Sequence, residues 1–203
     1  TYNGGKIWKD AVYNIQQYAP GKSLVQVIDS SSKDETLNIA RKAGFSIKTI
    51  DSSDFNHGGT RNLAVYEHAE LNDVVIFLTQ DAIPEPEFVT KIIAAFEDPL
   101  VACAWGRQLP HNDANPIAQH ARYFNYPCES HICSMHDSSK LGLKTVFMSN
   151  SFSAYRIKVF QELGGFPSNT ILCEDMYFTA KAVLAGYKVA YVSDAVVRHS
   201  HNY

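Results

Sequence analysis

The chain lacks long hydrophobic runs and a strong excess of either charge. Its longest apolar stretches, such as residues 74–78, are far shorter than the roughly 20 residues that a membrane-spanning helix needs. The formal net charge of −3 argues against a broad electrostatic contact with nucleic acid. The opening TYNGGK has no signal-peptide pattern. We therefore expect neither a membrane-spanning nor a nucleic-acid-binding chain.

Cysteine is also scarce, with 4 in 203 residues. So few cysteines cannot form a disulfide scaffold for a chain of this length, and they favour a reducing compartment. Two of them, Cys128 and Cys133, lie with His131 and His136 in the segment CESHICSMH and could form a tetrahedral zinc set. Such close spacing would strain four ligands around one ion. We favour a loop that is mobile or faces a substrate, with structural zinc as the alternative.

The residues that are present indicate a soluble globular domain, because 45% are apolar and 19% are charged. Compact apolar runs predict strands at residues 24–28, 45–50, 73–79 and 100–108. Apolar residues at helical spacing predict a helix from Ile7 to Tyr18, and we expect a further helix in each interval between the strands. This alternation predicts an α/β fold with a mostly parallel central sheet flanked by helices. An insert at 109–147 precedes a helix at 174–186 and a closing strand pair. We expect one domain over 1–203.

Polar residues follow three of the predicted strands. They are Asp29, the run 56–59 and the pair Gln80 and Asp81. Loops after parallel strands meet at the carboxyl edge of a sheet, where such folds bind ligands. The sequence therefore predicts one crevice that contains all three groups.

Each group also has a purely structural interpretation. Asp29 is either a turn residue or an acceptor for a nucleobase or ribose donor. The segment HGGTRN is either a glycine-rich turn with a surface arginine or a diphosphate site with Arg61 beside a helix start. Asp81 either begins the turn that Pro84 completes or binds Mg²⁺ or Mn²⁺.

Two histidines near the end, His199 and His201, alternate along a strand-like segment, so their side chains face the same way. Such a pair is more often structural than functional. Beside an ion on Asp81, one of them becomes a further ligand or a phosphate contact.

A series of motifs then resembles a known family over nearly the whole chain. In order they are TYNGG, VIDSSSKDET, HGGTRNLA, FLTQDAIP, SNSFSAYR, GGF and EDMYFTAKAVLAGYKVAYV. The series resembles the family 2 glycosyltransferases of the GT-A fold, and TQDA, WGRQLP, ARYFNYP and VRHSHNY look most like bacterial rhamnosyltransferases. Relatives begin with a strand before the TYN turn and continue past the last residue. We therefore expect that the first strand is missing and that the chain is trimmed at both ends.

The resemblance implies a nucleotide-sugar site in residues 1–108 and an acceptor and catalytic half in 109–203. Asp29 takes the place of the acid that recognises the base, and Arg61 faces the nucleotide. The residues expected to bind the nucleotide sugar are Thr1, Tyr2, Asp29, Arg61, Gln80 and Asp81.

The metal and catalytic assignments also come from the resemblance. Asp81 corresponds to the last acid of the family's D-x-D motif, whose first acid is Thr79 here, and His199 could compensate for the lost ligand. The expected cofactor is Mg²⁺ or Mn²⁺. Asp175 falls on the catalytic base, with Glu174 as its usual neighbour.

These assignments predict inverting transfer of a sugar, rhamnose from dTDP-rhamnose, to a saccharide or lipid-linked saccharide in cell-surface polysaccharide synthesis. Asp175 would deprotonate the acceptor hydroxyl. Glu174 would bind an acceptor hydroxyl or raise the pKa of Asp175 by like-charge repulsion. Trp105 and the aromatic residues of the insert would form an acceptor platform or belong to the core.

Other functions stay open. They are the same transfer from a UDP-hexose, a nucleotidyltransferase, a non-catalytic nucleotide-sugar-binding domain and a zinc-organised interaction module. We expect a cytoplasmic protein, with peripheral association at the inner face of the membrane left open. The sequence does not give the acceptor, the linkage or the oligomeric state.

Overall fold

The computed structural model describes residues 1–21, 25–70 and 72–201. Its helices are α1 Gly5–Tyr18, α2 Thr36–Ala43, α3 His57–His68, α4 Phe88–Ala94, α5 Pro116–Asn125, α6 Ser138–Leu141, α7 Ile157–Glu162 and α8 Glu174–Leu184. Its strands are β1 Gln26–Asp29, β2 Ser46–Thr49, β3 Val74–Leu78, β4 Ile83–Pro84, β5 Val101–Leu109, β6 His131–Cys133, β7 Phe152–Arg156 and β8 Lys188–Arg198. Short 3₁₀ turns lie at Ser52–Asp54, Ala95–Glu97, Met135–Asp137 and Gly142–Val146.

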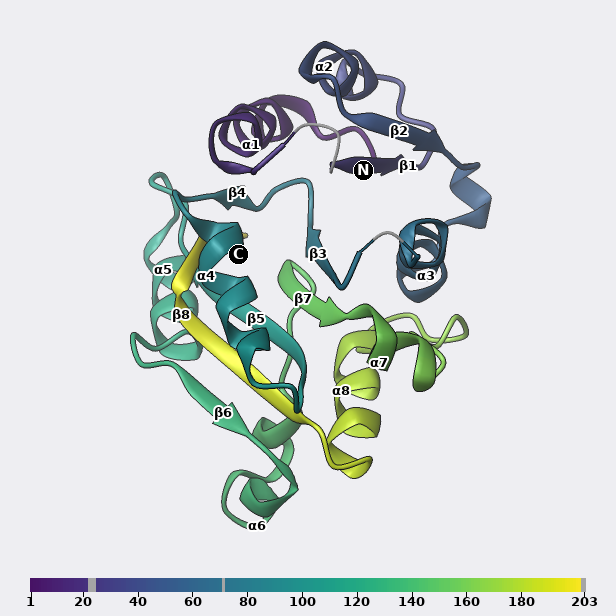
Figure 1. Cartoon of the computed structure of the whole chain (residues 1–203). Helices are drawn as coiled ribbons and strands as arrows, with labels where there is room; N and C mark the ends of the chain where they lie inside the picture. The colour runs from purple at the N-terminus through teal and green to yellow at the C-terminus, as the bar shows by residue number, and fades with distance from the viewer. Residues whose placement is uncertain (22–24, 71, 202–203) are drawn as a thin grey trace.

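The strands form two sheets. The parallel pair β1–β2 lies with α1 and α2 at the top of Figure 1, and the six-stranded sheet lies below it in the order β3-β7-β5-β8-β4, with β6 also paired to β8. Among the described residues of the six-stranded sheet, β5 and β8 are the one pair of neighbouring strands that run parallel. The α/β prediction is confirmed, but the sheet is mixed and not mostly parallel.

The insert explains this difference. The chain leaves β5 at Leu109 and returns into β7 at Phe152 on the same edge of the sheet, so β7 must run antiparallel to β5. Because β3 is in turn antiparallel to β7, the strands β3, β5 and β8 all point the same way. Their carboxyl ends therefore meet at one edge, together with the start of β7.

Most predicted elements are present, with shifted ends. The strand expected at 24–28 begins at Gln26, and position 24 lies outside the described residues. In the interval between the second and third expected strands, helix α3 begins at His57, because the Asn56 side chain caps it by accepting from the Gly59 N–H. The expected closing strand pair is the single long strand β8.

Helix α4 has no acidic residue in its first turn. Glu87 adopts a left-handed backbone conformation, φ 62°, and the helix begins only at Phe88. The acidic residues of PEPE therefore precede the helix.

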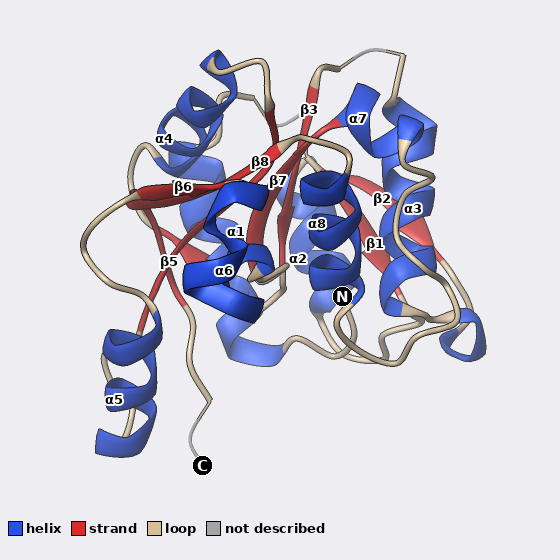
Figure 2. Cartoon of the chain, turned by 90° about the horizontal axis from the view of Figure 1, so that it is seen from below, coloured by secondary structure: helices blue, strands red, loops and turns tan. Residues whose placement is uncertain are grey.

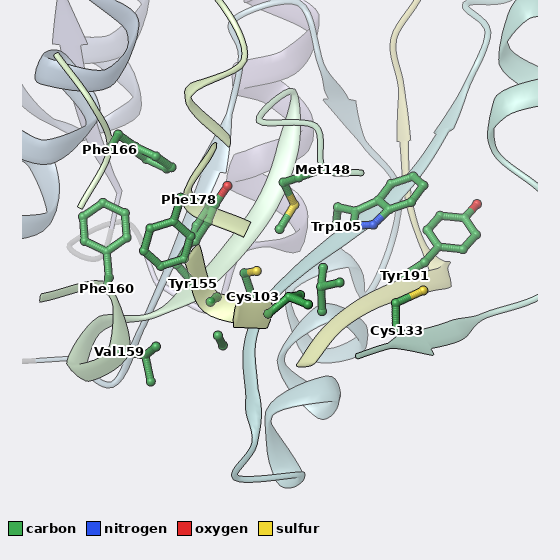
Figure 3. Close-up of a cluster of buried hydrophobic side chains, with 14 of the residues drawn as sticks. Cys103, Trp105, Cys133, Met148, Tyr155, Val159, Phe160, Phe166, Phe178 and Tyr191 are labelled. Carbon is green, nitrogen blue, oxygen red and sulfur yellow. The ribbon is translucent and has the colours of Figure 1, made fainter. Parts of the chain in front are cut away.

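Helices cover both faces of the six-stranded sheet (Figure 2). On one face, Tyr155, Phe160, Phe166 and Phe178 pack edge to face between β7, α7 and α8 (Figure 3). On the other face, α4 packs Phe88 and Ile92 over the strands. In the described part of the chain, we find no helix with the length and apolar character that crossing a membrane requires.

Candidate active site

The metal ligands predicted from the sequence meet at the shared carboxyl edge. Asp81 follows β3 and His199 follows β8, and their Oδ2 and Nε2 atoms are 3.3 Å apart. The Nε2 atom of His201 lies 3.9 Å from the same carboxylate oxygen. These three side chains are the one group of three or more His, Cys, Asp or Glu within the described ranges whose ligand atoms all lie within 4.8 Å of one another.

The electrostatics of this group favour a positive charge at its centre. Burial acts to raise the pKa of Asp81, but the hydrogen bond and the charge interaction with His199 outweigh burial and hold the pKa well below its usual range. Burial and the neighbouring His199 lower the pKa of His201, so its ring is more readily neutral. An ionised carboxylate beside two imidazole rings is a suitable donor set for a divalent ion, which would take the place of any proton on the ligating nitrogens.

The catalytic pair predicted from the sequence opens α8, and the structure separates its two members. Glu174 is buried, only 5% exposed, and its Oε1 accepts from Arg61 Nη1 at 2.7 Å. Asp175 is partly exposed, and its two oxygens accept from the backbone N–H groups of Asn150 and Met176. Glu174 is therefore part of a buried ion pair, whereas Asp175 presents a carboxylate to the edge.

Asp175 has a perturbed acidity. Burial raises its pKa, the two backbone N–H groups act to lower it, and the nearby Glu174 carboxylate adds to the rise. The net result is a pKa above the ordinary aspartate value of 3.8.

Asn150 connects these groups and was missed by the sequence analysis. Its side-chain Nδ2 donates to Glu174 Oε1 at 3.0 Å, while its Oδ1 accepts from Ser153 Oγ and Tyr155 Oη at 2.8 and 2.7 Å. Its backbone N–H binds Asp175, as above. The residue lies in SNSFSAYR, one of the motifs that carry the family resemblance, and that was the one indication of its role in the sequence.

The residues predicted to bind the nucleotide lie near one another. Asp29 ends β1 and is fully buried, with its carboxylate accepting from Thr1 Oγ1, Ser32 Oγ and Ser32 N. Tyr2, which is 52% exposed, exchanges two backbone hydrogen bonds with the side-chain amide of Gln80. Asp29 and Gln80 thus hold the segment that contains Thr1 and Tyr2.

Of the two glycines of HGGTRN, Gly58 has a packing role. A Cβ built on Gly58 would lie 2.1 Å from the carbonyl oxygen of Pro167, whereas one on Gly59 meets nothing closer than 3.4 Å. Gly58 therefore lets the loop before α8 approach α3. The N–H of Gly59 is used by the Asn56 cap and is not offered to a diphosphate.

Trp105 does not fit the predicted acceptor role. It is 5% exposed and packs among Tyr126, Phe147 and Tyr191 in the core shown in Figure 3. The reason is its place in β5, a central strand covered on both faces. Tyr123 and Phe124 on α5 remain exposed, at 56% and 74%.

The zinc alternative also fails. Cys133 is buried in the core while Cys128 is exposed, and their cluster is absent from the close groups of potential ligands in the described segments. His131 instead packs against the Trp105 and Tyr191 rings.

Comparison with known proteins identifies the class. Residues 4–202 match the sequence model described as "Glycosyltransferase like family 2", and the chain belongs to this family. It is 56% identical over 205 residues to the O-antigen chain rhamnosyltransferase RfbN of Salmonella typhimurium and 53% identical to the O-antigen chain rhamnosyltransferase WbaN of Salmonella anatum. Each comparison covers 100% of this chain, and the chain spans 65% of the length of each relative.

Solved structures show the same fold. The chain superposes with a TM-score of 0.71 and 17% identity on the mannosyltransferase PcManGT from Pyrobaculum calidifontis in complex with GDP-Man and Mn²⁺, covering 98% of this chain and 55% of that one. The TM-score is 0.73, with 20% identity, for S. aureus TarS 1-349 in complex with UDP-GlcNAc, covering 100% and 57%. The predicted GT-A fold is confirmed.

Proposed function

We propose that the protein transfers a rhamnosyl residue from dTDP-rhamnose to a hydroxyl of a saccharide or lipid-linked saccharide in O-antigen synthesis, with inversion at the anomeric carbon. The observation that carries this proposal is the 56% identity to RfbN along the whole chain. The proposal places the reaction in the cytoplasm, at the inner face of the membrane where the acceptor is lipid-linked.

Asp175 is the proposed catalytic base. It accepts the proton of the acceptor hydroxyl as that oxygen attacks the anomeric carbon, and the bond from this carbon to the diphosphate oxygen breaks. A carboxyl that is partly exposed, with a pKa raised by burial, suits this role better than one buried in an ion pair. Glu174 therefore acts by holding Arg61 and not by binding the acceptor.

The donor half of the site recognises the nucleoside and its diphosphate. Thr1 and Tyr2 form the nucleoside wall, and Asp29 and Gln80 fix its position through the bonds described above. Arg61 Nη1 is engaged by Glu174 and the His57 carbonyl, which leaves the Nε and Nη2 donors of the guanidinium for a phosphate oxygen.

The ligands Asp81, His199 and His201 would hold a divalent ion. A set with two imidazoles and one carboxylate favours Mn²⁺ over Mg²⁺, because Mg²⁺ prefers oxygen ligands throughout. A bound ion would supply Lewis-acid stabilisation of the diphosphate leaving group. The Mn²⁺ in the PcManGT complex gives the same expectation by analogy.

The donor assignment is tested with a panel of nucleotide sugars. Melting temperatures are measured with and without Mn²⁺ for dTDP-rhamnose, UDP-hexoses and the free nucleotides. We expect the largest Mn²⁺-dependent increase with the dTDP compounds. A larger increase with UDP-sugars would favour the hexosyl alternative, and no increase with any nucleotide would refute the donor site.

The reaction is tested with product analysis. The expected products are dTDP and a rhamnosylated acceptor; release of pyrophosphate would indicate a nucleotidyltransferase, and donor binding without turnover a binding domain. The Asp175→Asn variant should bind the donor as the wild type does and lose transfer by roughly 10²- to 10⁴-fold. Asp10→Asn on the exposed face of α1 is the matched control, with unchanged transfer.

A further inference from the structure

A buried glutamine supports the imidazole that faces Asp81. Gln108 lies near the end of β5 and is fully buried. Its Oε1 is 2.8 Å from His199 Nδ1 and 3.2 Å from Arg122 Nη1, and its Nε2 donates to Ser149 Oγ at 2.8 Å. Three neighbours therefore contact this one amide.

The neighbours fix which way the amide points. A guanidinium only donates hydrogen bonds, so the atom of Gln108 that faces Arg122 must be its oxygen. The same oxygen faces His199, and the hydroxyl of Ser149 accepts from the amide nitrogen on the other side. Rotating the amide by half a turn would bring two donors together at Arg122.

The amide in turn fixes the histidine. An oxygen acceptor at Nδ1 requires that this nitrogen carries a proton. The Nε2 of a neutral His199 then has a lone pair, and it points at the Oδ2 of Asp81, 3.3 Å away. These two acceptor atoms repel each other at this distance unless a cation lies between them. That cation is either a second proton on the imidazole or a metal ion.

We propose that Gln108 is a positioning residue that holds His199 in the Nδ1–H tautomer and thereby prepares its Nε2 to bind a divalent ion with Asp81. Arg122 contributes by orienting the amide. Because Arg122 lies on α5, inside the insert, this segment serves the metal site as well as any acceptor. The inference deepens the proposed function and rests on its metal site.

The expected effect of Gln108 on metal affinity can be taken from equivalent residues in other metalloproteins. Residues that accept the second N–H of a metal-bound imidazole fix its orientation and raise its basicity, and losing them typically lowers metal affinity by about 10- to 100-fold. Gln108→Met keeps the length of the side chain and removes the amide oxygen. Gln108→Glu keeps an acceptor at Nδ1 and a partner for Arg122.

The first measurement is Mn²⁺ binding to the chain without nucleotide, by titration with detection of free Mn²⁺ by electron paramagnetic resonance. We expect about 10- to 100-fold weaker binding for Gln108→Met and wild-type or tighter binding for Gln108→Glu. Gln119→Met is the matched control, because Gln119 lies on α5 and its amide donates to the Ala114 carbonyl. It should bind Mn²⁺ as the wild type does.

The second measurement needs no variant. The ¹⁵N chemical shifts of the His199 ring, recorded in the wild type without metal at a pH where the ring is neutral, distinguish the two tautomers. We expect the proton on Nδ1. A proton on Nε2 would overturn the inference, and so would wild-type Mn²⁺ affinity in a folded Gln108→Met variant.

Neither measurement uses a nucleotide sugar or a transfer assay. A chain that binds Mn²⁺ and shows the Nδ1–H tautomer but transfers no sugar would refute the proposed function and leave this inference standing. A chain that transfers rhamnose but binds no Mn²⁺ would refute this inference alone.

Discussion

The carboxylate of Glu174 and the guanidinium of Arg61 form a buried ion pair, 2.7 Å between Oε1 and Nη1, that joins α8 to α3. The side chains are 7% and 17% exposed. The pair thus connects the proposed donor half with the helix that carries the proposed base.

Removing one partner should leave an uncompensated buried charge. Glu174→Ala is expected to lower the free energy of unfolding by about 3–5 kcal/mol, measured by urea denaturation. Lys91→Ala, which breaks the exposed pair with Glu87, is the control and should cost less than about 0.5 kcal/mol. Equal decreases in the free energy of unfolding in the two variants would show that the buried ion pair stabilises the protein no more than the exposed one.

The perturbed acidity of Asp175 should appear in the pH dependence of transfer. The base works only when deprotonated, so kcat should fall as the pH drops through its pKa. Because burial raises this pKa, the fall should occur at a higher pH than the ordinary value of 3.8 would give. The measurement is kcat against pH at saturating donor. A flat profile down to pH 4 would exclude Asp175 as the base.

Asn150 should influence the rate without contributing to donor binding. Asn150→Ala removes the amide that donates to Glu174. Without this side chain the loop is held less firmly, and the backbone N–H of this loop is the group that binds Asp175. We expect kcat to fall on the order of 10- to 100-fold, because a misplaced base loses near-attack geometry. The Kd for the donor should change little. Asn38→Ala, at an exposed position of α2, is the control.

In Asn150→Asp, a second carboxylate would replace the amide donor 3.0 Å from Glu174 Oε1. Repulsion should make this variant less active and less stable than Asn150→Ala. The opposite order would contradict the bonding described for Asn150.

Adjacent glycines should respond differently to the same substitution. Gly58→Ala forces a methyl group against the Pro167 carbonyl and should destabilise the protein by about 1–3 kcal/mol. Gly59→Ala adds a methyl group at contact distance in a helix and should be neutral or stabilising by up to about 1 kcal/mol. Thermal unfolding of the two variants measures the difference, and similar melting temperatures would refute the packing role of Gly58.

Trp105 and Phe124 should respond differently to truncation, because Trp105 is buried and Phe124 is exposed. Trp105→Ala removes a core side chain and should cost about 3–5 kcal/mol. Phe124→Ala, on the exposed face of α5, should change stability by less than about 0.5 kcal/mol. If α5 contacts the acceptor, Phe124→Ala raises the KM for acceptor alone; an unchanged KM would remove Phe124 from the acceptor platform.

The sequence predicted the elements well because local patterns determine them. Apolar runs located β3 and β5, and the ordered motifs singled out Asp81, His199 and Asp175 as candidate site residues. The strand directions were not predictable from those patterns, because the direction of β7 depends on where the 109–147 excursion ends.

The supporting residues were harder to predict for a related reason. Gln108 lies in the motif WGRQLP at the end of an apolar run, but its contacts with Arg122 and His199 join positions that lie 14 and 91 residues away. Trp105 was ambiguous because an aromatic side chain packs equally well against a sugar or a core. Only the assembled sheet places it inside.

The division into two sheets has a consequence for how the protein responds to its ligand. Thr1 accepts from the Ser30 N–H beside the small sheet, and Tyr2 is bonded through Gln80 to the loop after β3. A nucleotide on Thr1 and Tyr2 would therefore contact the segment through which the small sheet is hydrogen-bonded to the loop after β3. Amide hydrogen exchange in β1 and β2 should slow on donor binding more than exchange in β5. The bound donor would then stabilise the small sheet against local unfolding.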